Sequence, residues 1–238
     1  MLVHADVKGL EIVAAGYLSQ DPILMSEIVD QFDFHADNQA RFKLPNRTVA
    51  KQFVFKLLYG GTAYGYTVDA KFNWISRKES FWQDMIDSYY DKYKGIAAWH
   101  KQIIATVTET SQLVMPTGRV YQFQRYPAYG GGMKWPITQI KNYPVQGLGA
   151  DLVAIGRVAL WKRVKKAMWA PVLFQSTVHD SIDLDTTPEL CYNICKLAKE
   201  SIEDIPLNFE RLFGVKFNLP VTAEIKYGNN LGEMTVYE

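Results

Sequence analysis

The order of apolar and polar positions predicts that the chain starts with a strand and continues into helices. Residues 2–7 form a short apolar run typical of a buried strand, and residues 11–18 carry apolar side chains at helical spacing. Asp21-Pro22 ends that helix and begins a second apolar pattern. The first segment is therefore expected to be a strand, a turn and a pair of helices.

The middle of the chain predicts further helices. Residues 46–59 show a strong helical pattern that Gly60-Gly61 would end. Residues 78–110 are rich in aromatic side chains and predict a long helix or a helical pair, with Gly95 as the expected break.

Strands return in the last half of the chain. In order, the pattern predicts a hairpin over 115–123, a flexible glycine-rich loop over 129–133, a helix over 148–167, a strand pair over 172–185, an amphipathic helix over 188–205 and a final strand over 221–227. With strands at both ends and helices between, the fold class is α+β.

The totals allow one large compact unit or two closely packed subdomains, since 48% of the 238 residues are hydrophobic. The net charge of +1 gives no general sign of nucleic-acid binding, which must be argued from local clusters. No apolar run approaches the roughly 20 residues of a membrane span, so a soluble protein is expected. Cys191 and Cys195, four residues apart on one helix face, are read as reduced thiols of a cytoplasmic protein, with half a metal site as the alternative.

Two aspartates are candidate metal ligands. Asp6 ends the first strand, and Asp180 lies in Val178-His179-Asp180-Ser181 within the predicted strand pair. Carboxylates on adjacent central strands can hold two Mg²⁺ ions, which prefer oxygen ligands. Alternatively, each aspartate only caps a turn.

The helix over 46–59 carries a second candidate site. Arg47, Lys51, Phe55 and Tyr59 recur every four residues and form one stripe about 18 Å long. A cationic half followed by an aromatic half suits a ligand with phosphates at one end and a sugar and base at the other. The alternative is a solvated basic helix end followed by two buried aromatic side chains.

Taken together, these segments resemble the motifs of family A (DNA polymerase I-like) DNA polymerases. Residues 6–11 with 18–21 look like motif A, residues 47–60 like motif B and residues 178–180 like motif C, while 142–147 with 150–152 match a further family pattern. The resemblance spans nearly the whole chain, in the family's order and at near-family spacing.

The resemblance implies a role for each matching residue. Asp6, Asp180 and the carbonyl of Val7 would bind the two Mg²⁺ ions. The nucleotide-binding residues would be Glu11 for sugar selection, Arg47, Lys51 and His35 for the triphosphate, Phe55 for the sugar and base, and Tyr59 for the template-base position. The DNA-binding residues would be Asn142 and Gln146 in the minor groove and His179 at the primer terminus. As a hypothesis, Lys51 also acts as a catalytic general acid toward pyrophosphate.

Two positions depart from the family pattern. Ser181 stands where the family usually has a glutamate, and Gly9 stands where a glutamine is common. We expect activity to survive with altered metal dependence. On an extended strand, Asp183 and Asp185 would point to the face opposite Asp180, so neither is expected to replace the missing carboxylate.

The resemblance predicts a polymerase palm with a central antiparallel sheet and an inserted helical fingers subdomain, without thumb and exonuclease domains. Residues 1–24 and 136–238 would form the palm and residues 25–135 the fingers. The partners would be primer-template DNA, deoxynucleoside triphosphates and a second polypeptide or upstream segment that supplies the thumb and the remaining palm. The strand over 2–7 is expected to leave a sheet edge for that partner.

The expected reaction is template-directed addition of deoxynucleotides to a primer 3′-end by two-metal-ion transfer, in a bacterial or phage-infected cytoplasm. The phage-like compactness of the motifs favours a virus or mobile element as the source. A non-catalytic DNA-binding or scaffolding subunit is the first rival, and the retention of Asp6, Asp180, Lys51 and Arg47 together argues against it. A two-metal nuclease is a second rival, and it would normally carry more carboxylates.

Overall fold

The computed structural model describes residues 1–168 and 171–238, which form two compact units. The first unit comprises residues 1–14 and 146–238, and the second comprises residues 15–145. The boundaries fall inside helices α1 (Leu10–Ser19) and α8 (Ile137–Lys166), which each contribute to both units. The expected palm and fingers divisions, at 24/25 and 135/136, stay predictions.

The first unit contains a five-stranded sheet and two further helices. Its elements are β1 (Leu2–Val7), β6 (Val172–Val178), β7 (Ser181–Thr186), α9 (Pro188–Glu203), α10 (Ile205–Phe213), β8 (Ala223–Asn230) and β9 (Glu233–Val236). The predicted strand pair over 172–185 and the helix over 188–205 are confirmed. The strand predicted over 221–227 is present as β8 but is not the final one, because β9 pairs with it.

The second unit is mostly helical. Its elements are α2 (Pro22–Val29), α3 (Phe34–Phe42), α4 (Arg47–Leu58), α5 (Ala63–Val68), α6 (Glu79–Lys92), α7 (Lys94–Thr110), β2 (Gln112–Val114), β3 (Val120–Gln122), β4 (Tyr126–Pro127) and β5 (Met133–Lys134). The hairpin predicted over 115–123 is present as β2–β3. The loop predicted over 129–133 is the turn of a second hairpin, β4–β5, which the sequence pattern did not reveal.

The sheet has the strand order β6-β7-β1-β8-β9, and its neighbouring strands pair antiparallel. Strand β1 lies at the centre, paired with β7 on one side and with β8 on the other. The expectation that residues 2–7 leave a free sheet edge is therefore wrong. The partner strands come from the far end of the chain, and the local sequence around β1 carries no sign of them.

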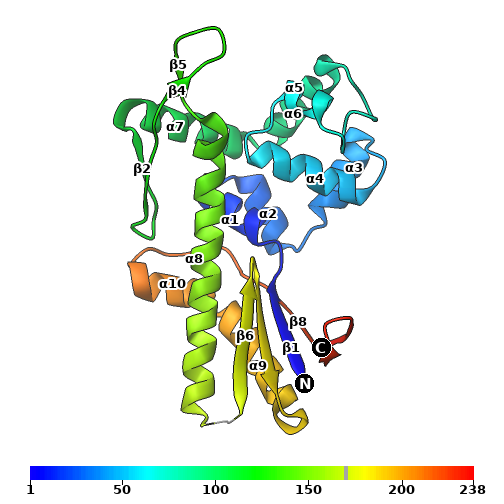
Figure 1. The fold of residues 1–238 in the computed structure, drawn as a ribbon, viewed down its shortest axis with the longest axis vertical. Helices are drawn as coiled ribbons and strands as arrows, with labels where there is room; N and C mark the ends of the chain where they lie inside the picture. Colours follow the sequence, from blue (N-terminus) through cyan, green and yellow to red (C-terminus); the bar gives the residue numbers. More distant parts are fainter. Residues whose placement is uncertain (169–170) are drawn as a thin grey trace. The chain divides into compact units, whose positions relative to one another are not determined.

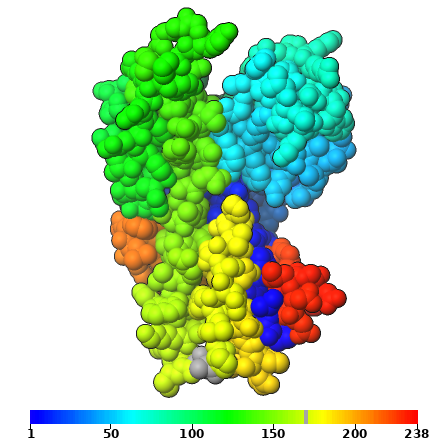
Figure 2. Space-filling model, viewed as in Figure 1, coloured from blue at the N-terminus to red at the C-terminus, as the bar shows by residue number. Residues whose placement is uncertain are grey.

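Alternation of side chains gives the sheet one buried and one open face. Val3, Ala5 and Val7 of β1 are almost fully buried, whereas the intervening side chains are only half-buried. Helix α9 packs along β8, β1 and β7 and lies behind them in Figure 1. On the opposite face, β1 (blue) and the β6–β7 hairpin (yellow) reach the surface in Figure 2.

Helix α8 begins at Ile137, earlier than the predicted residue 148, and continues through Pro144. A proline inside a helix removes one backbone hydrogen bond and normally costs about 3 kcal/mol. The neighbouring Ile140, Val145 and Leu148 are almost fully buried, and this packing compensates for the lost bond.

The second unit is built around aromatic side chains. Phe53, Tyr66, Phe72 and Trp82 are almost fully buried and make ring contacts with one another at centroid distances of 5.0–6.1 Å. The Tyr66 hydroxyl donates a hydrogen bond of 2.8 Å to the Phe53 carbonyl, so the one polar atom of this ring is satisfied. This cluster fixes the inner side of α4.

The helical pair predicted over 78–110 is confirmed, but its break is at Tyr93, between α6 and α7, and not at Gly95. Gly95 lies in the first turn of α7, where its backbone N–H donates to the Asp21 carboxylate at 2.6 Å. A Cβ at Gly95 would approach the Asp21 Cα within 2.6 Å. This glycine therefore permits a close approach and does not end a helix.

Candidate active site

Asp6 is held by the central strand of the sheet. It pairs with Ser181 on β7 and with Glu224 on β8, and its half-buried side chain is on the open face. Because β1 is bonded on both sides, the position of this carboxylate is fixed by backbone hydrogen bonds of two neighbouring strands.

The sequence pattern placed Asp180 within the strand pair over 172–185. In the structure, Asp180 lies in the turn that joins the two strands, β6 and β7. Val178 pairs with Ser181, so the turn consists of His179 and Asp180, and His179 has a left-handed φ of 53°. The Val7 N–H donates to the Asp180 carbonyl at 3.1 Å, which ties this turn to the end of β1. The geometry therefore brings the two predicted metal ligands, Asp6 and Asp180, together.

The electrostatics of Asp6 reflect this arrangement. Partial burial, the negative charge of Asp180 and a hydrogen bond with Asp180 together raise the pKa of Asp6 to about 6. His4 opposes the shift, and Glu224 adds to it. Two carboxylates that repel each other in this way are stabilised by a bound cation.

Asp183 is on the same face of the sheet as Asp6. Residue 183 pairs with His4, and the side chains of Asp6 and His4 alternate with the buried ones of β1. Asp183 was expected on the face opposite Asp180 because side chains alternate between faces along a strand. This alternation does not extend to Asp180, because that residue is in a turn. Asp183 accepts a hydrogen bond from Ser176 at 2.6 Å and contacts His4 Nδ1 at 2.6 Å. These two partners occupy its carboxylate.

Ser181, which replaces the family's usual glutamate, is buried. Its hydroxyl donates to the Val178 carbonyl at 3.0 Å across the turn. The side chain therefore stabilises the hairpin that carries Asp180. Glu224, the other carboxylate beside Asp6, forms an ion pair with Lys226, and the hydrogen bond from Lys226 lowers its pKa.

The donor set suits Mg²⁺ by its chemistry. Asp6 and Asp180 offer hard oxygen atoms, and neither forms an ion pair among the residues that the structure describes. Within those same residues, no group of three or more His, Cys, Asp or Glu side chains is arranged to hold a metal ion. Cys191 and Cys195 are buried free thiols on α9.

In the second unit, α4 presents the predicted cationic and aromatic stripe. The Asn46 side chain caps the helix by accepting from the Val49 N–H at 2.9 Å, which confirms the predicted start. Arg47 and Lys51 are exposed, and Phe55 and Tyr59 are half-buried. The core residues of α4 are on its other side: Val49, Ala50, Phe53, Val54, Leu57 and Leu58. Phe55 and Tyr59 are therefore not fully buried core residues, as the alternative interpretation of the stripe required.

The side chains of the stripe contact one another in sequence order. Lys51 Nζ is 5.4 Å from the centroid of the Phe55 ring, and the Phe55 and Tyr59 rings stack with centroids 6.3 Å apart. The stripe thus forms a continuous surface that changes from cationic to aromatic along the helix.

His35 joins this group from α3. Its ring packs edge-on against Phe55 at 5.5 Å, and burial, together with the charges of Arg47 and Lys51, lowers its pKa to about 4. The imidazole is therefore neutral near pH 7. Its buried Nδ1 has no hydrogen-bond partner among the described residues, so this atom can still accept or donate a bond to a ligand.

Asp33 is a site residue that the sequence reasoning missed. It caps α3 by accepting a hydrogen bond from the Ala36 N–H, and its carboxylate accepts a second hydrogen bond, of 2.9 Å, from Arg47 Nε. The hydrogen bond from Arg47 lowers the pKa of Asp33. The N-cap position before α3 was the available signal, but the pairing with Arg47 depends on the packing of two helices.

The remaining predicted residues lie on other elements. Glu11 is half-buried in the first turn of α1, and His179 is exposed in the β6–β7 turn. Asn142 and Gln146 are one turn apart on α8, and the buried Asn142 Oδ1 has no hydrogen-bond partner among the described residues. Of these residues, Glu11, Gln146 and His179 belong to the first unit with Asp6, whereas Asn142 belongs to the second unit, which also carries α4.

The pattern that defines DNA polymerase family A matches residues 1–233. The chain belongs to DNA polymerase family A. The chain is 27% identical over 225 residues to DNA polymerase I of Pseudomonas aeruginosa, covering 88% of this chain and 24% of that protein. It is 26% identical over 214 residues to the thermostable DNA polymerase I of Thermus aquaticus, covering 86% of this chain and 25% of that protein. The chain thus spans about a quarter of the length of these relatives.

A solved structure has the same fold. It is the polymerase domain of Pol1 from M. smegmatis in complex with a DNA primer-template and dNTP, with a TM-score of 0.75 and 16% sequence identity. The likeness covers 96% of this chain and 39% of that one. It confirms the expected α+β polymerase fold of this family A member. None of the helices in the described residues is both long and apolar enough to cross a membrane.

The raised pKa of Asp6 predicts a stability cost that depends on pH. Because the folded-state pKa is above the usual value of 3.8, the charged carboxylate destabilises the fold above about pH 6, and the cost disappears as the pH falls below 4. With metal chelated, Asp6→Asn should raise the free energy of unfolding by about 1 kcal/mol near pH 8, after allowance for solvent screening. Urea unfolding near pH 8 and near pH 4 measures this difference. An equal effect at both pH values would show that the Asp6 charge carries no such cost.

Proposed function

We propose that this chain performs template-directed DNA synthesis, adding deoxynucleotides to a primer 3′-end. The observation that carries the proposal is the pair of adjacent carboxylates, Asp6 and Asp180: burial and the neighbouring charge of Asp180 together raise the pKa of Asp6 to about 6. A DNA-binding module has no need of such a pair, whereas nucleotidyl transfer does. Family membership supports the choice of reaction.

The metal ions in this proposal are two Mg²⁺. Asp6, Asp180 and the backbone carbonyl of Val7 would hold them, and when bound they would activate the primer hydroxyl and neutralise the leaving pyrophosphate. Burial of Ser181 and the pairing of Asp183 with His4 leave Asp6 and Asp180 as the main side-chain donors. Altered metal dependence follows from this small donor set.

The stripe on α4 would bind the incoming nucleotide. Arg47 and Lys51 would hold the triphosphate, with His35 as a neutral hydrogen-bonding partner. Arg47 would exchange the Asp33 carboxylate for phosphate oxygens, which offer it equally charged acceptors. Phe55 would contact the sugar and base, and Tyr59 would lie at the template-base position. The general-acid role of Lys51 stays a prediction.

The remaining residues would select and hold the DNA. Glu11 would exclude a 2′-hydroxyl, and His179 would contact the primer terminus from its exposed turn. Asn142 and Gln146 would contact minor-groove acceptors, which all base pairs present. The buried, unpartnered Oδ1 of Asn142 supports an added hydrogen-bond partner in the DNA complex.

We further propose that synthesis uses a thumb and further palm residues, from an upstream segment or a second polypeptide. The support is electrostatic: a net charge of +1 offers few phosphate contacts for holding duplex DNA. The concentration of cations at the end of α8, Arg163, Lys165 and Lys166, is small, and Arg163 already pairs with Asp204. A viral or phage origin stays a prediction.

A non-catalytic scaffolding subunit is the alternative function. It would retain the fold and the DNA contacts without a need for the two carboxylates. Substitution of Asp180 separates the two functions, because only an enzyme would lose turnover.

Asp180→Ala should reduce primer extension by at least about a thousandfold, since it removes a ligand of both metal ions. Single-turnover extension of a labelled primer with Mg²⁺ measures the rate. Asp185→Ala on the same hairpin is the matched control and should extend at the unaltered rate. Extension by Asp180→Ala at the unaltered rate would refute the catalytic role of Asp180.

Phe55→Tyr should raise the incorporation of dideoxynucleotides relative to deoxynucleotides by about tenfold, because a new hydroxyl would bond to a nucleotide that lacks its own 3′-OH. Competition between the two nucleotides on one template gives the ratio. The control is Phe81→Tyr on α6, which adds the same hydroxyl elsewhere and should leave the ratio unchanged. An unchanged ratio in Phe55→Tyr would remove Phe55 from the sugar site.

The proposed need for upstream residues is tested by binding. The 238-residue chain should bind primer-template weakly and with a shallow salt dependence, and addition of the upstream polypeptide should increase both affinity and salt dependence. Fluorescence anisotropy of a labelled duplex at several salt concentrations measures both. Tight binding and sustained synthesis by the 238-residue chain alone would contradict this proposal.

A further inference from the structure

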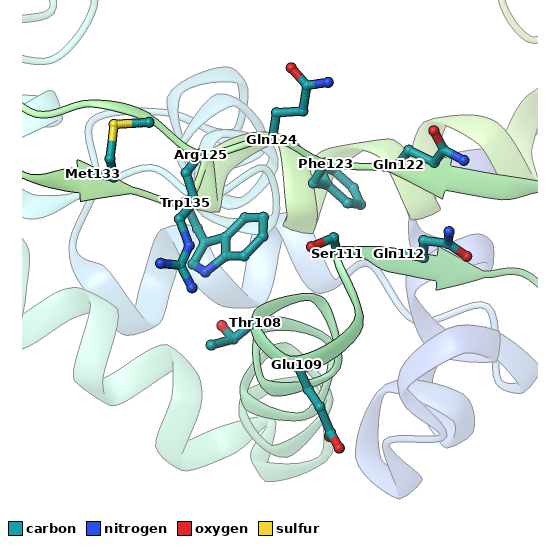
Figure 3. A pocket seen from close by; sticks show the side chains of 10 residues that line it. All are labelled: Thr108, Glu109, Ser111, Gln112, Gln122, Phe123, Gln124, Arg125, Met133 and Trp135. Carbon is teal, nitrogen blue, oxygen red and sulfur yellow. The ribbon is translucent and has the colours of Figure 1, made fainter.

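A cavity of about 750 Å³ lies in the second unit, between the end of α7 and the two hairpins β2–β3 and β4–β5 (Figure 3). It is lined by Thr108, Glu109, Ser111, Gln112, Gln122, Phe123, Gln124, Arg125, Met133 and Trp135. These residues are separate from the stripe on α4 and from the carboxylates of the first unit. The cavity is large enough for a nucleotide-sized group.

Most of the cavity lining comes from a stretch of the sequence whose charged residues are all basic. Between Glu109 and Asp151 the sequence contains no aspartate or glutamate. The same stretch contains four cations, namely Arg119, Arg125, Lys134 and Lys141. In a chain with 26 basic and 25 acidic residues, such a stretch is a local concentration of positive charge. The Glu109 side chain points away from Trp135 in Figure 3. This surface is complementary to a polyanion.

Arg125 and Trp135 form the main recognition pair of the cavity. The Arg125 guanidinium lies over the Trp135 ring at 4.9 Å from its centroid. Among the described residues, Arg125 has no hydrogen-bond or ion-pair partner, so its N–H groups can bind a phosphate. Trp135 is half-buried, which leaves part of its ring accessible for stacking.

The β4–β5 hairpin extends this surface with exposed aromatic side chains. Tyr126 is 43% exposed and has Lys134 over its ring at 5.2 Å, and Tyr129 at the turn is fully exposed. Exposed aromatic rings beside cations are the usual means of binding unpaired bases, because every base has a face that can stack. Duplex DNA offers no such faces along its length.

The polar lining adds hydrogen-bonding groups that suit bases of any sequence. Gln112, Gln122 and Gln124 are exposed, and their amides both donate and accept. Gln124 points away from the cavity in Figure 3, whereas the Phe123 and Trp135 rings lie between the hairpins and the end of α7. Amide groups of this kind can bond to base edges without fixing one sequence.

We propose that this cavity and the β4–β5 hairpin bind unpaired, single-stranded DNA, with a base stacked on Trp135 and a phosphate held by Arg125. The proposal rests on the proposed function, in which the unpaired strand is template that has not yet been copied. The hairpin would hold that strand outside the nucleotide-binding stripe.

The test is binding of a fluorescent oligo-dT of about 20 nucleotides, compared with a blunt duplex, by anisotropy. Trp135→Leu should weaken single-strand binding by about tenfold, whereas Trp135→Phe, which keeps a stacking ring, should retain most of it. Arg125→Gln should reduce the slope of log affinity against log salt by about 0.7, the value for one lost phosphate contact on a single strand. The matched controls, Trp74→Leu and Arg77→Gln, change exposed residues of the same unit outside the cavity and should have no effect.

Several outcomes would overturn the proposal. These are unaltered single-strand binding in both Trp135→Leu and Arg125→Gln, an equal loss for the blunt duplex, or an equal loss in the controls. If circular dichroism shows that Trp135→Leu is unfolded, Arg125→Gln and Trp135→Phe decide the matter.

Primer extension separates this proposal from the proposed function. With a template overhang of one nucleotide, Arg125→Gln should extend like the unaltered chain, and with a long overhang it should need more DNA for half-maximal rate. Absence of synthesis on every template even after addition of the upstream polypeptide, together with Trp135-dependent oligo-dT binding, would refute the polymerase function and leave the binding site standing. Normal synthesis without any effect of Arg125→Gln on long overhangs would refute the template role.

Discussion

The fold of the first unit has to hold two like charges close together. Partial burial and the repulsion between Asp6 and Asp180 together raise the pKa of Asp6 to about 6. The backbone supplies the restraint: β1 is paired on both sides, and the Asp180 carbonyl accepts from the Val7 N–H. Burial of the other face of β1 against α9 provides the compensating free energy. The repulsion is tolerated because side chains alternate along β1, so the apolar face and the charged face of the strand are separate.

In the second unit, helix α4 likewise packs an apolar side into the core and presents functional side chains on the other side. The inner side of α4 is fixed by the aromatic cluster around Phe53, so its outer side is not needed for that core. Arg47, Lys51 and Phe55 can therefore be arranged for a ligand at little cost to stability. The neutral, buried His35 of α3 contacts this outer side: its ring packs on Phe55, and its Nδ1 has no hydrogen-bond partner within the described residues.

Sequence reasoning succeeded where the signal was local. The start of the helix near residue 46, the Asp21-Pro22 start of α2 and the four-residue spacing on α4 depend only on neighbouring residues. It failed where distant segments meet. Gly95 was read as a helix break because its contact with Asp21 spans 74 residues of sequence. Asp183 was placed on the wrong face because strand alternation was extended through the turn at Asp180.

Short elements were missed for a different reason. Strands β4 and β5 have two residues each, which is too few for a period of two to be recognised. The three glycines of their turn, all with positive φ, instead suggested a flexible loop. The helical start of α8 was missed because Pro144 is normally a helix breaker, and only tertiary packing offsets its cost.

The net charge of +1 conceals a separation of charge that the proposed chemistry requires. A protein that binds a polyanion through divalent cations needs carboxylates where the metal binds and must exclude them where phosphate binds. Here Asp6, Asp180 and Glu224 gather at one sheet, while residues 110–150 contain no carboxylate at all. If carboxylates and phosphate-binding cations were mixed, they would neutralise each other. An acidic side chain beside Arg125 would form an ion pair with it, as Asp33 does with Arg47. The net charge of a chain therefore does not show where the metal and the phosphates would bind, whereas the order of its charges does.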